Sequence, residues 1–361
     1  MLRVGIIGAT GMVGQRYISL LQGHPWFTVT AVAASASSAG VPYEQSVKGR
    51  WQMIEPIPEG VQNLVVLEAI NVEAMAKACD FVFSAVEMPD KEMVKKLEES
   101  YAAAGLPVVS NASAHRWTTD VPMLIPEINA DHTKMIDAQK KKRGWSRGFI
   151  AVKPNCSIQS FLTPIHALRA AGYDIDRLAV TTMQAVSGAG YPGVASLDMI
   201  DNIVPYIGGE EEKTEKEPLK ILGQIKKEAF VLADDITITA QCNRVPVTDG
   251  HTACVSMGFA KKKPTREEIL KIWRAFVSVP QKLQLPSAPL TPIIYLDEDN
   301  RPQPKKDRNR EQGMAVSVGR LRECPVFDFK FVGLSHNTIR GAAGGGILNA
   351  ELLVKQGYIS A

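Results

Sequence analysis

The residues Gly8-Ala9-Thr10-Gly11-Met12-Val13-Gly14 join an apolar strand-like run, residues 2–7, to a helix-like stretch, residues 12–21. Glycines at such a junction allow a tight turn and let backbone N–H groups approach a pyrophosphate at the helix N-terminus. The spacing is not the commoner Gly-x-Gly-x-x-Gly, and a glycine motif alone could be a plain turn. The strand–turn–helix context favours a dinucleotide site. The loop residues expected to bind there are Gly8, Thr10, Gly11, Met12, Val13 and Gly14.

The first half of the chain alternates between strand-like and helix-like stretches. Further strands are predicted at residues 27–33, 64–67, 80–86 and 107–110, and a charged amphipathic helix at residues 89–104. Such alternation is typical of a parallel sheet with helices on both faces. The sequence therefore predicts an α/β, Rossmann-like dinucleotide-binding domain at the N-terminus.

The second half has longer strand-like runs and fewer helices. Strands are predicted at residues 178–187, 236–246, 251–259, 314–320 and 327–332. Residues 236–240 alternate strictly between apolar and polar, as expected for a sheet with one covered face. A capping box at Thr265 and Glu268 predicts a helix over residues 269–277. We expect an α+β domain with a mixed sheet.

Three other segments are interpreted from their composition. Residues 208–218 are dense in Glu and Lys, residues 296–312 are charged and contain two prolines, and both are predicted to be loops or excursions. Residues 339–356 are predicted to form a helix. Its glycines at 344–346 destabilise a helix interior, so they indicate close packing or approach to a ligand.

Length, charge and cysteine usage exclude several classes of protein. The 361 residues are enough for two domains, and a formal net charge of +3 gives no nucleic-acid footprint. No apolar run approaches membrane-spanning length, and no signal-peptide pattern precedes the first strand. The five cysteines are odd in number and widely spread, which argues against a disulfide framework. We expect a cytoplasmic protein with no membrane or nucleic-acid partner.

Cys156 is the first candidate for chemistry. It lies in Lys153-Pro154-Asn155-Cys156-Ser157, between a strand-like run at residues 148–152 and a helix-like stretch at residues 157–171. A cysteine in the first turn of a helix faces the positive end of the helix dipole, which lowers the thiol pKa and favours the nucleophilic thiolate. The alternative is a buried cysteine that packs as a small apolar residue.

The loop after the second predicted strand bears on the cofactor. An NAD site usually has Asp or Glu about 20 residues beyond the glycines, to bind the ribose hydroxyls. Residues 33–40 contain no acid, but they include Ser35, Ser37 and Ser38, which could surround a 2′-phosphate. The same serines could simply shape a turn, and no Arg or Lys accompanies them. We expect NADP rather than NAD.

Three later motifs complete the set. They are Gln184-Ala185-Val186-Ser187-Gly188-Ala189-Gly190, then Asn243-Arg244-Val245-Pro246-Val247-Thr248-Asp249-Gly250-His251, and finally Ser335-His336-Asn337-Thr338-Ile339-Arg340-Gly341. In this order, with the glycine loop and Cys156, they make nearly the whole chain resemble aspartate-β-semialdehyde dehydrogenase. Residues 209–213 and 217–222 are most similar to the archaeal and fungal branch. The chain departs from the family at residues 35–40, where many members carry a basic residue.

The resemblance implies a phosphorylating aldehyde dehydrogenase that works through a thioester. A thiolate adds to the aldehyde, hydride leaves to the nicotinamide, and phosphate releases the acyl group. In biosynthesis of lysine, threonine, methionine and isoleucine the steps run backwards, from L-4-aspartyl phosphate to L-aspartate 4-semialdehyde. By resemblance, Cys156 is the nucleophile, His251 the acid and base, and Gln184 the orienting residue.

The resemblance also implies which residues bind the ligands. Arg244 matches the residue that holds the substrate carboxylate, a task that suits a planar guanidinium. Glu210 would take the substrate ammonium group, and Lys213 and Arg116 the phosphate. Asn155 is placed with the substrate-binding residues; Ser187, Gly188 and Asn337 are placed with the cofactor-binding residues. No metal is expected. Taken singly, each could be a structural residue, such as one partner of a surface salt bridge.

Domains and partners follow from the same resemblance. Residues 1–155 plus 338–361 would form the Rossmann-like NADP-binding domain, and residues 156–337 a catalytic and dimerisation domain. The expected partners are aspartyl phosphate or aspartate semialdehyde, inorganic phosphate, and further copies of the chain in a homodimer or homotetramer.

Three alternatives remain beside this interpretation. N-acetyl-γ-glutamyl-phosphate reductase has the same architecture and chemistry, but a free α-amino group calls for an acid such as Glu210. Glyceraldehyde-3-phosphate dehydrogenase has its nucleophile in a different Ser-Cys-Thr-Thr-Asn setting. A non-catalytic dinucleotide-sensing module would keep the glycine loop and lose Cys156 or His251, and this chain has both.

Overall fold

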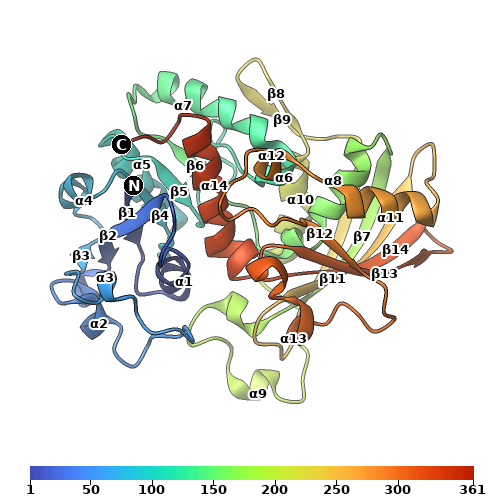
Figure 1. The fold of residues 1–361 in the computed structure, drawn as a ribbon, viewed down its shortest axis with the longest axis horizontal. Helices are drawn as coiled ribbons and strands as arrows, with labels where there is room; N and C mark the ends of the chain where they lie inside the picture. Colours follow the sequence, from blue (N-terminus) through green and yellow to red (C-terminus); the bar gives the residue numbers. More distant parts are fainter.

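Two six-stranded sheets organise the molecule, and the computed structural model describes all residues from Met1 to Ala361 (Figure 1). The first sheet is parallel throughout, in the order β3-β2-β1-β4-β5-β6. Its strands are β1 (Leu2–Ile7), β2 (Phe27–Ala34), β3 (Leu67–Glu68), β4 (Phe81–Ser84), β5 (Val108–Ser110) and β6 (Ile150–Val152). The order reverses beside β1, as in Rossmann-like sheets, whose ligands bind at that reversal. The predicted α/β domain is confirmed.

Helices from both ends of the chain cover the first sheet. They are α1 (Met12–Leu20), α4 (Val72–Ala78), α5 (Lys91–Ala103), α7 (Met135–Arg143) and α14 (Gly344–Lys355), with short turns α2 (Tyr43–Ser46), α3 (Glu59–Gln62), α6 (Pro126–Asn129), η1 (Ala36–Ser38) and η2 (Ala130–Lys134). The side chain of Asp90 caps α5 by accepting a hydrogen bond from the Glu92 N–H. The last helix, α14, returns to pack against α1 and β5 (Figure 1).

The second sheet is mixed, with the order β10-β7-β11-β14-β13-β12. Its strands are β7 (Ile175–Gln184), β10 (Thr237–Arg244), β11 (His251–Phe259), β12 (Ile293–Leu296), β13 (Val316–Glu323) and β14 (Phe329–Ser335), and a separate hairpin pairs β8 (Gln224–Lys226) with β9 (Ala229–Val231). Two pairs, β10 with β7 and β12 with β13, are parallel, and the others are antiparallel. The predicted mixed sheet is confirmed.

Helices α8 (Leu162–Ala170) and α11 (Arg266–Ala275) pack together beside the second sheet. α11 starts at the predicted capping box, since Thr265 and Glu268 exchange side-chain and backbone hydrogen bonds. Trp273 then donates its indole N–H to the Pro164 carbonyl of α8 at 2.9 Å. A core of 43 buried residues extends from the first sheet into the second, so the two parts share one hydrophobic core.

The prediction of a loop at residues 208–218 is wrong, because α10 (Glu210–Ile221) occupies this segment. Three glutamates in its first turn are favourable at the positive end of the helix dipole. The buried side of α10 has helical spacing but carries Glu210, Thr214 and Glu217. Because that face is largely polar, the usual hydrophobic periodicity gives no signal.

The prediction of an exposed loop at residues 296–312 is wrong in part. The segment contains a short helix, α13 (Pro304–Asp307), and a 3₁₀ turn, η5 (Arg310–Gly313). Asp307 is buried and forms ion pairs with Arg301 and Arg310. The charged composition of the segment gave no sign of these buried ion pairs. Paired charges can be buried where single charges cannot.

The helix predicted at residues 157–171 is interrupted. A single 3₁₀ turn, η3 (Ser157–Ser160), follows Cys156, the chain leaves the helical conformation at Phe161, and α8 then begins. Pro164 lies in the first turn of α8, where its missing N–H removes no helical hydrogen bond. Cys156 therefore precedes a short turn and not a long helix.

The predicted C-terminal helix consists of a π turn, η6 (Ile339–Ala343), followed by α14. Its glycines lie where the backbone packs most closely. A Cβ on Gly341 would lie 2.9 Å from the Cβ of Cys156, and one on Gly346 would lie 1.9 Å from the Tyr17 hydroxyl. Glycine is therefore required for the last helix to contact both the cysteine loop and α1.

Candidate active site

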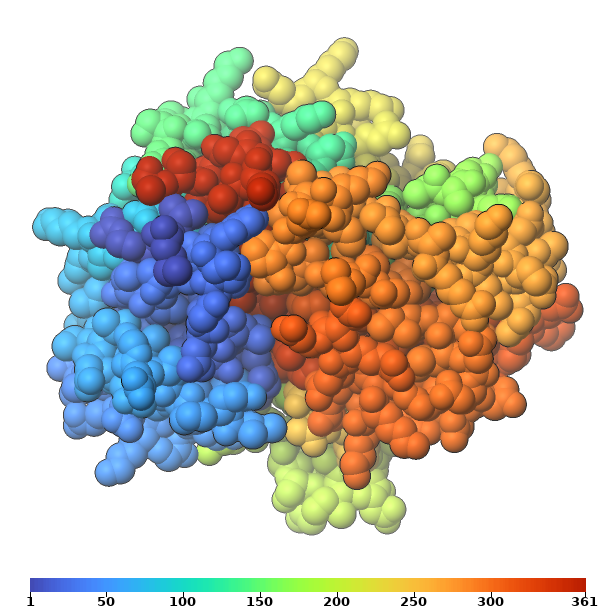
Figure 2. Space-filling view, in the orientation of Figure 1, coloured from blue at the N-terminus to red at the C-terminus, as the bar shows by residue number.

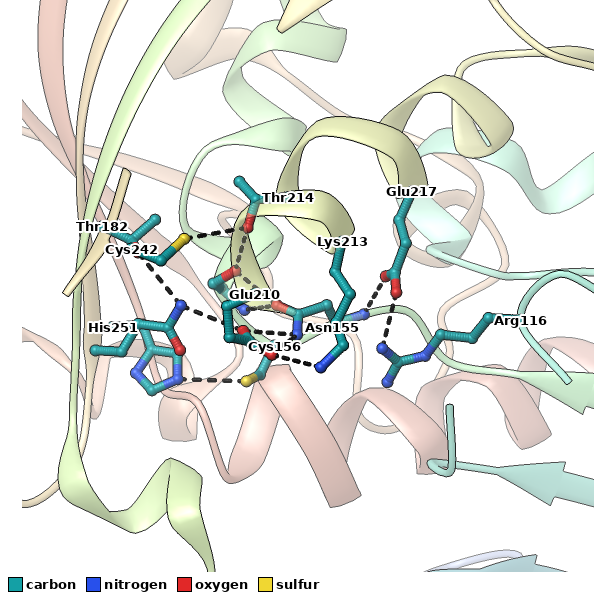
Figure 3. Close-up of polar contacts among 12 residues, drawn as sticks. Arg116, Asn155, Cys156, Thr182, Glu210, Lys213, Thr214, Glu217, Cys242 and His251 are labelled. Carbon is teal, nitrogen blue, oxygen red and sulfur yellow. Dashed lines mark hydrogen bonds and ion pairs between the residues drawn. The ribbon is translucent and has the colours of Figure 1, made fainter. Parts of the chain in front are cut away.

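Cys156 and His251 meet where the two sheets adjoin (Figure 3). Cys156 follows β6 of the first sheet, and His251 is the first residue of β11 in the second. The Sγ of Cys156 lies 3.3 Å from the Nε2 of His251. The imidazole is fully buried and the thiol is half-buried. Cys156 is therefore the more accessible of the two residues, and the imidazole of His251 lies on its buried side.

A backbone hydrogen bond fixes the tautomer of His251. Its Nδ1 accepts the Ala185 N–H at 3.0 Å, so in the neutral ring the proton is on Nε2, which points to the sulfur. Burial, and next the charge of Arg244, lower the pKa of His251 to about 3. At neutral pH the ring is therefore neutral and donates from Nε2.

The thiol pKa differs from the sequence prediction. Burial, and next the carboxylate of Glu210, raise the pKa of Cys156 to about 11. Three cations, Lys153, Arg116 and Arg244, oppose this shift. The predicted lowering by a helix dipole is wrong, because only the short η3 turn follows the cysteine. Activation of the thiol therefore depends on these cations and on the hydrogen bond from Nε2 of His251.

Glu210 is the centre of a buried hydrogen-bond network at the start of α10 (Figure 3). Its carboxylate accepts hydrogen bonds from the Asn155 amide at 2.9 and 3.0 Å and from the Gln184 amide at 3.3 Å. Lys213, one turn further along α10, donates to it at 2.7 Å. Burial alone would raise the pKa of Glu210, but the Lys213 ammonium and the two amides lower it below its ordinary value.

A second carboxylate on the same helix holds the chain before Cys156. Glu217 accepts the Asn155 N–H at 2.6 Å and the Arg116 guanidinium at 2.8 Å, and both side chains of this ion pair are buried. Arg116 also donates to the carbonyl of Lys153 at 3.1 Å. Its third nitrogen donates to the Asn111 carbonyl at 3.3 Å, so all three guanidinium nitrogens bind protein groups and only part of the five N–H donors is left for a ligand.

Arg244, at the end of β10, lies beside the imidazole. Its Nη1 donates to the Ala185 carbonyl at 2.8 Å, so one residue, Ala185, orients both Arg244 and His251. A Cβ on Gly188 would lie 2.9 Å from the Arg244 Nη1 and 3.2 Å from the His251 ring. The absence of a side chain at Gly188 keeps the approach to both groups open.

A cleft of about 470 Å³ gives access to this site from both halves of the chain. It is lined by ten of the residues singled out from sequence: Met12, Val13, Arg116, Asn155, Cys156, Ser187, Gly188, Glu210, Lys213 and Asn337. Gln184, Arg244 and His251 lie behind its wall and are buried. A larger cavity of about 730 Å³ lies near Gly23 and Leu285, but it contains none of the predicted residues.

The glycine loop has the shape of a phosphate cradle. A Cβ on Gly8 would lie 2.5 Å from the Ala85 carbonyl oxygen, and one on Gly14 would lie 2.3 Å from that of Gly8. Gly11 is the exposed N-cap of α1 and offers no side-chain cap, so the first N–H groups of the helix face outward. This loop fits the pyrophosphate of a dinucleotide.

The residues expected at the two ends of the dinucleotide lie just beyond β2 and just after β14. Ser35 and Ser37 are exposed just beyond β2, with their hydroxyls 3.0 Å apart, whereas Ser38 is buried. At the other end, the Asn337 amide accepts the Gly250 N–H and donates to the Ser187 hydroxyl, both at 2.8 Å. Asn337 therefore ties the end of β14 to the glycine turn after β7.

Comparisons with known proteins agree with this architecture. The family model described as semialdehyde dehydrogenase, NAD binding domain, matches residues 3–136, and that described as semialdehyde dehydrogenase, dimerisation domain, matches residues 165–340. The aspartate-semialdehyde dehydrogenase of Schizosaccharomyces pombe is 46% identical over 99% of both chains. The chain belongs to the aspartate-semialdehyde dehydrogenase family.

Further members of this family are similar over the same length. The aspartate-semialdehyde dehydrogenase of Methanothermobacter thermautotrophicus is 44% identical, over 98% of this chain and 99% of its own. The crystal structure of aspartate-semialdehyde dehydrogenase with NADP from Candida albicans has a TM-score of 0.90 at 43% identity, and the match covers 99% of this chain and all of that chain. The similarity thus extends to fungal and archaeal members, as the sequence indicated.

Sequence reasoning missed several residues that hold this family site together. The carboxylate of Glu217 and the backbone of Ala185 each bind two elements of the site. Glu217 lies seven residues after Glu210, so a helix prediction for α10 would have placed both on one face. No sequence signal identifies the Ala185 N–H, because any residue supplies a backbone donor.

One structural finding bears on the membrane. None of the helices has the length and apolar character needed to cross a bilayer.

Proposed function

We propose that this chain catalyses the reversible, NADP-linked reduction of L-4-aspartyl phosphate to L-aspartate 4-semialdehyde, with release of phosphate. The observation that carries the proposal is the Cys156–His251 pair, 3.3 Å apart, at a cleft that is also lined by Glu210, Lys213 and residues 12 and 13 of the glycine loop. The test is NADP reduction with aspartate semialdehyde, with and without phosphate. Equal rates in both conditions, or preference for the N-acetylglutamate analogue, would contradict it.

Cys156 and His251 carry the covalent chemistry in this proposal. In the oxidative direction the Cys156 thiolate attacks the aldehyde carbon, and the oxyanion that develops accepts a hydrogen bond from Nε2 of His251. The carbonyl forms again as a hydride leaves the same carbon for the nicotinamide, which yields the thioester. Phosphate then attacks the acyl carbon, and the thiolate leaves. The Nδ1 bond to Ala185 keeps Nε2 directed at the reacting atoms throughout.

The substrate-binding roles require one rearrangement. Arg244 has donors free beyond its bond to Ala185, and it suits the substrate α-carboxylate. Glu210 is assigned to the substrate ammonium group, but Lys213 already pairs with it at 2.7 Å. An ammonium group that takes Glu210 frees Lys213, whose side chain is partly exposed, to bind the phosphate. Arg116 supports the same phosphate through the N–H groups that Glu217 and the carbonyls of Lys153 and Asn111 leave free.

NADP fits the glycine loop, the serines after β2 and the end of the cleft at Asn337. Gly8, Gly11 and Gly14 would hold the pyrophosphate, Ser35 and Ser37 the 2′-phosphate, and Asn337 with Ser187 the nicotinamide end. The bound cofactor supplies or accepts hydride at the substrate carbon. The loop after β2 contains no Lys or Arg, so the preference for NADP depends on hydrogen bonds from neutral groups. Each contributes about 0.5–1.5 kcal/mol, or about 1.5–3 kcal/mol to a charged acceptor.

We expect Ser37→Asp to reverse the cofactor preference. The new carboxylate repels a 2′-phosphate and offers a partner to the ribose hydroxyls of NAD. The measurement is kcat/KM for both cofactors, with Ser37→Ala as the control that removes the hydroxyl without adding charge. The control should weaken NADP use and leave NAD use unchanged. A wild type that already prefers NAD, or an unchanged ratio in Ser37→Asp, would refute the assignment.

We further propose that the chain forms a homodimer or homotetramer through residues 191–206, which we call the arm. The arm includes α9 (Ser196–Met199) and projects from the bottom of the molecule in Figures 1 and 2. It exposes Tyr191, Leu197, Ile200, Ile203 and Tyr206. Because the arm lies within the match to a dimerisation domain, a second copy of the chain is the occupant that best covers this surface.

Charging the arm should weaken assembly. Leu197 is 85% exposed and Ile200 66%, so replacing both by Glu leaves the monomer fold intact while placing two charges in the interface. Sedimentation at several protein concentrations should show dissociation of this variant. Leu290→Glu, at an 87% exposed leucine outside the arm, is the matched control. An unchanged oligomer in the double variant would place the interface elsewhere.

The domain division and the compartment complete the proposal. The division into residues 1–155 plus 338–361 and residues 156–337 is supported by the two sheets and by the return of α14 to the first. Cytoplasmic location is supported by five cysteines that are all free.

A further inference from the structure

Lys153 is a buried cation with no acidic partner. Its side chain is 2% exposed, and its Nζ makes one hydrogen bond, to the Pro154 carbonyl at 2.8 Å. The nearby cations are paired differently: Arg116 binds Glu217, and Arg340 binds Glu127 at 2.7 Å. A buried ammonium group without a counter-ion is costly, so its retention beside Cys156 requires a reason.

Lys153 and Cys156 pack against the same stretch of the C-terminal helix. A Cβ on Gly345 would lie 3.0 Å from the Cε of Lys153, and a Cβ on Gly341 would lie 2.9 Å from the Cβ of Cys156. Beside Lys153 there is a cavity of only about 10 Å³, which is room for about one water. Bulk solvent therefore does not reach the lysine, whereas the thiol lines the open cleft.

His251 does not supply a positive charge to stabilise the Cys156 thiolate. Its Nδ1 accepts the Ala185 N–H, so a second ring proton would break that bond, and the ring stays neutral. The thiolate of Cys156 thus has a hydrogen-bond donor in His251 but no imidazolium. Among the cations that stabilise the thiolate, Lys153 acts most strongly, ahead of Arg116 and Arg244.

We propose that Lys153 is the positioning residue that carries the counter-charge of the Cys156 thiolate. The pair exchanges one proton, from thiol plus amine to thiolate plus ammonium, and its net charge does not change. This inference rests on the proposed role of Cys156 as the nucleophile. It adds a lysine that acts through the cysteine and does not touch the substrate.

The proposal gives the thiol an unusual pH profile. Burial lowers the pKa of Lys153 to about 7, while Cys156 raises it. Below that pH, the thiolate fraction rises as protons are removed. Above it, the thiolate–ammonium and thiol–amine forms have equal charge, so their ratio is independent of pH. The plateau extends over about one pH unit for each tenfold by which the ammonium group stabilises the thiolate, and a second rise follows as the thiolate–amine form increases.

Charged side chains from several elements face the pair. They are Arg116 from the loop after β5, Glu217 and Glu210 from α10, Arg244 from β10, Glu127 from α6 and Arg340 from η6. His251 is neutral throughout, because its pKa is lowered to about 3. A plateau near neutral pH is therefore diagnostic of the lysine.

The experiment is the alkylation rate of Cys156 by iodoacetamide between pH 5 and pH 11, followed by mass spectrometry of the Cys156 peptide. In the wild type we expect a rise, a plateau above about pH 7 and a second rise. In Lys153→Met, which keeps the unbranched stem, the plateau should vanish. The rate at pH 7 should fall about tenfold or more, because a neighbouring cation lowers a pKa by about one unit or more.

Controls separate this role from a structural one. Lys220→Met removes another buried lysine, whose Nζ binds backbone carbonyls of residues 116 and 121, and it should leave the profile unchanged. Lys153→Gln is the second neutral variant if the methionine disturbs folding. In turnover, the neutral variants should lower kcat and leave the KM for the semialdehyde nearly constant.

Two outcomes would overturn the proposal. A wild-type profile with a single ionisation and no plateau contradicts it without any variant. A plateau that persists in folded Lys153→Met or Lys153→Gln assigns the charge to another group. If Cys156 is never alkylated and its loss leaves turnover intact, the proposed function fails instead, so the two failures are distinguishable.

Discussion

Cys156→Ser should bind NADP normally and lose turnover by about three orders of magnitude or more. An alcohol is a far weaker nucleophile than a thiolate at neutral pH, and residues that form the covalent intermediate show effects of this size. The substitution removes no buried hydrogen bond other than the 3.3 Å contact with His251, so the fold should persist. The measurements are kcat with saturating semialdehyde and cofactor binding by fluorescence.

The control for this variant is a cysteine outside the cleft. Cys254 lies exposed on β11, and Cys254→Ser should leave kcat unchanged. An alkylating reagent should inactivate the enzyme in step with labelling of Cys156, whatever it does at Cys254. Full activity after complete labelling of Cys156 would show that this residue is not the nucleophile.

Arg244→Lys should lower kcat/KM for the semialdehyde by about 10- to 100-fold, because one hydrogen bond to a charged group contributes about 1.5–3 kcal/mol. Lysine keeps the charge but loses the planar fork that could bind a carboxylate while also holding the Ala185 carbonyl. The phosphate KM should change little. Steady-state kinetics with each substrate varied in turn provides the measurement.

The matched variant for Arg244 is Arg116→Lys, at the arginine assigned to phosphate. It should raise the phosphate KM and spare that of the semialdehyde. Because Arg116 pairs with buried Glu217 at 2.8 Å, retaining a positive charge limits the damage to the fold. If Arg244→Lys raises only the phosphate KM, the two arginines exchange roles.

The fold could be predicted where its signals are local. The glycine loop, the alternation of the first half and the capping box at Thr265 each act within a few residues, and all three are present in the structure. α10 could not be predicted, because its buried face carries Glu210, Thr214 and Glu217. These side chains are buried because they bind residues that are distant in the sequence. A local hydrophobic pattern carries no information about such partners.

The sequence could predict which residues form the site, but not the hydrogen bonds and ion pairs between them. The motifs identified Cys156, His251 and Glu210, which the fold brings together. They did not reveal that Lys213 forms an ion pair with Glu210, or that Glu217 forms one with Arg116. The predicted effect of a helix dipole on the thiol was wrong, because the sequence after Cys156 is compatible with a helix that the structure breaks at Phe161.

The most direct test of the central claim is a rapid-mixing experiment without phosphate. Enzyme mixed with aspartate semialdehyde and NADP should release a burst of about one NADPH per active site and then nearly stop, because the acyl group remains on Cys156. Mass spectrometry of the quenched enzyme should locate one aspartyl group on that residue, and added phosphate should restore turnover. Steady turnover without phosphate, or a burst with the acyl group on another residue, would contradict the account.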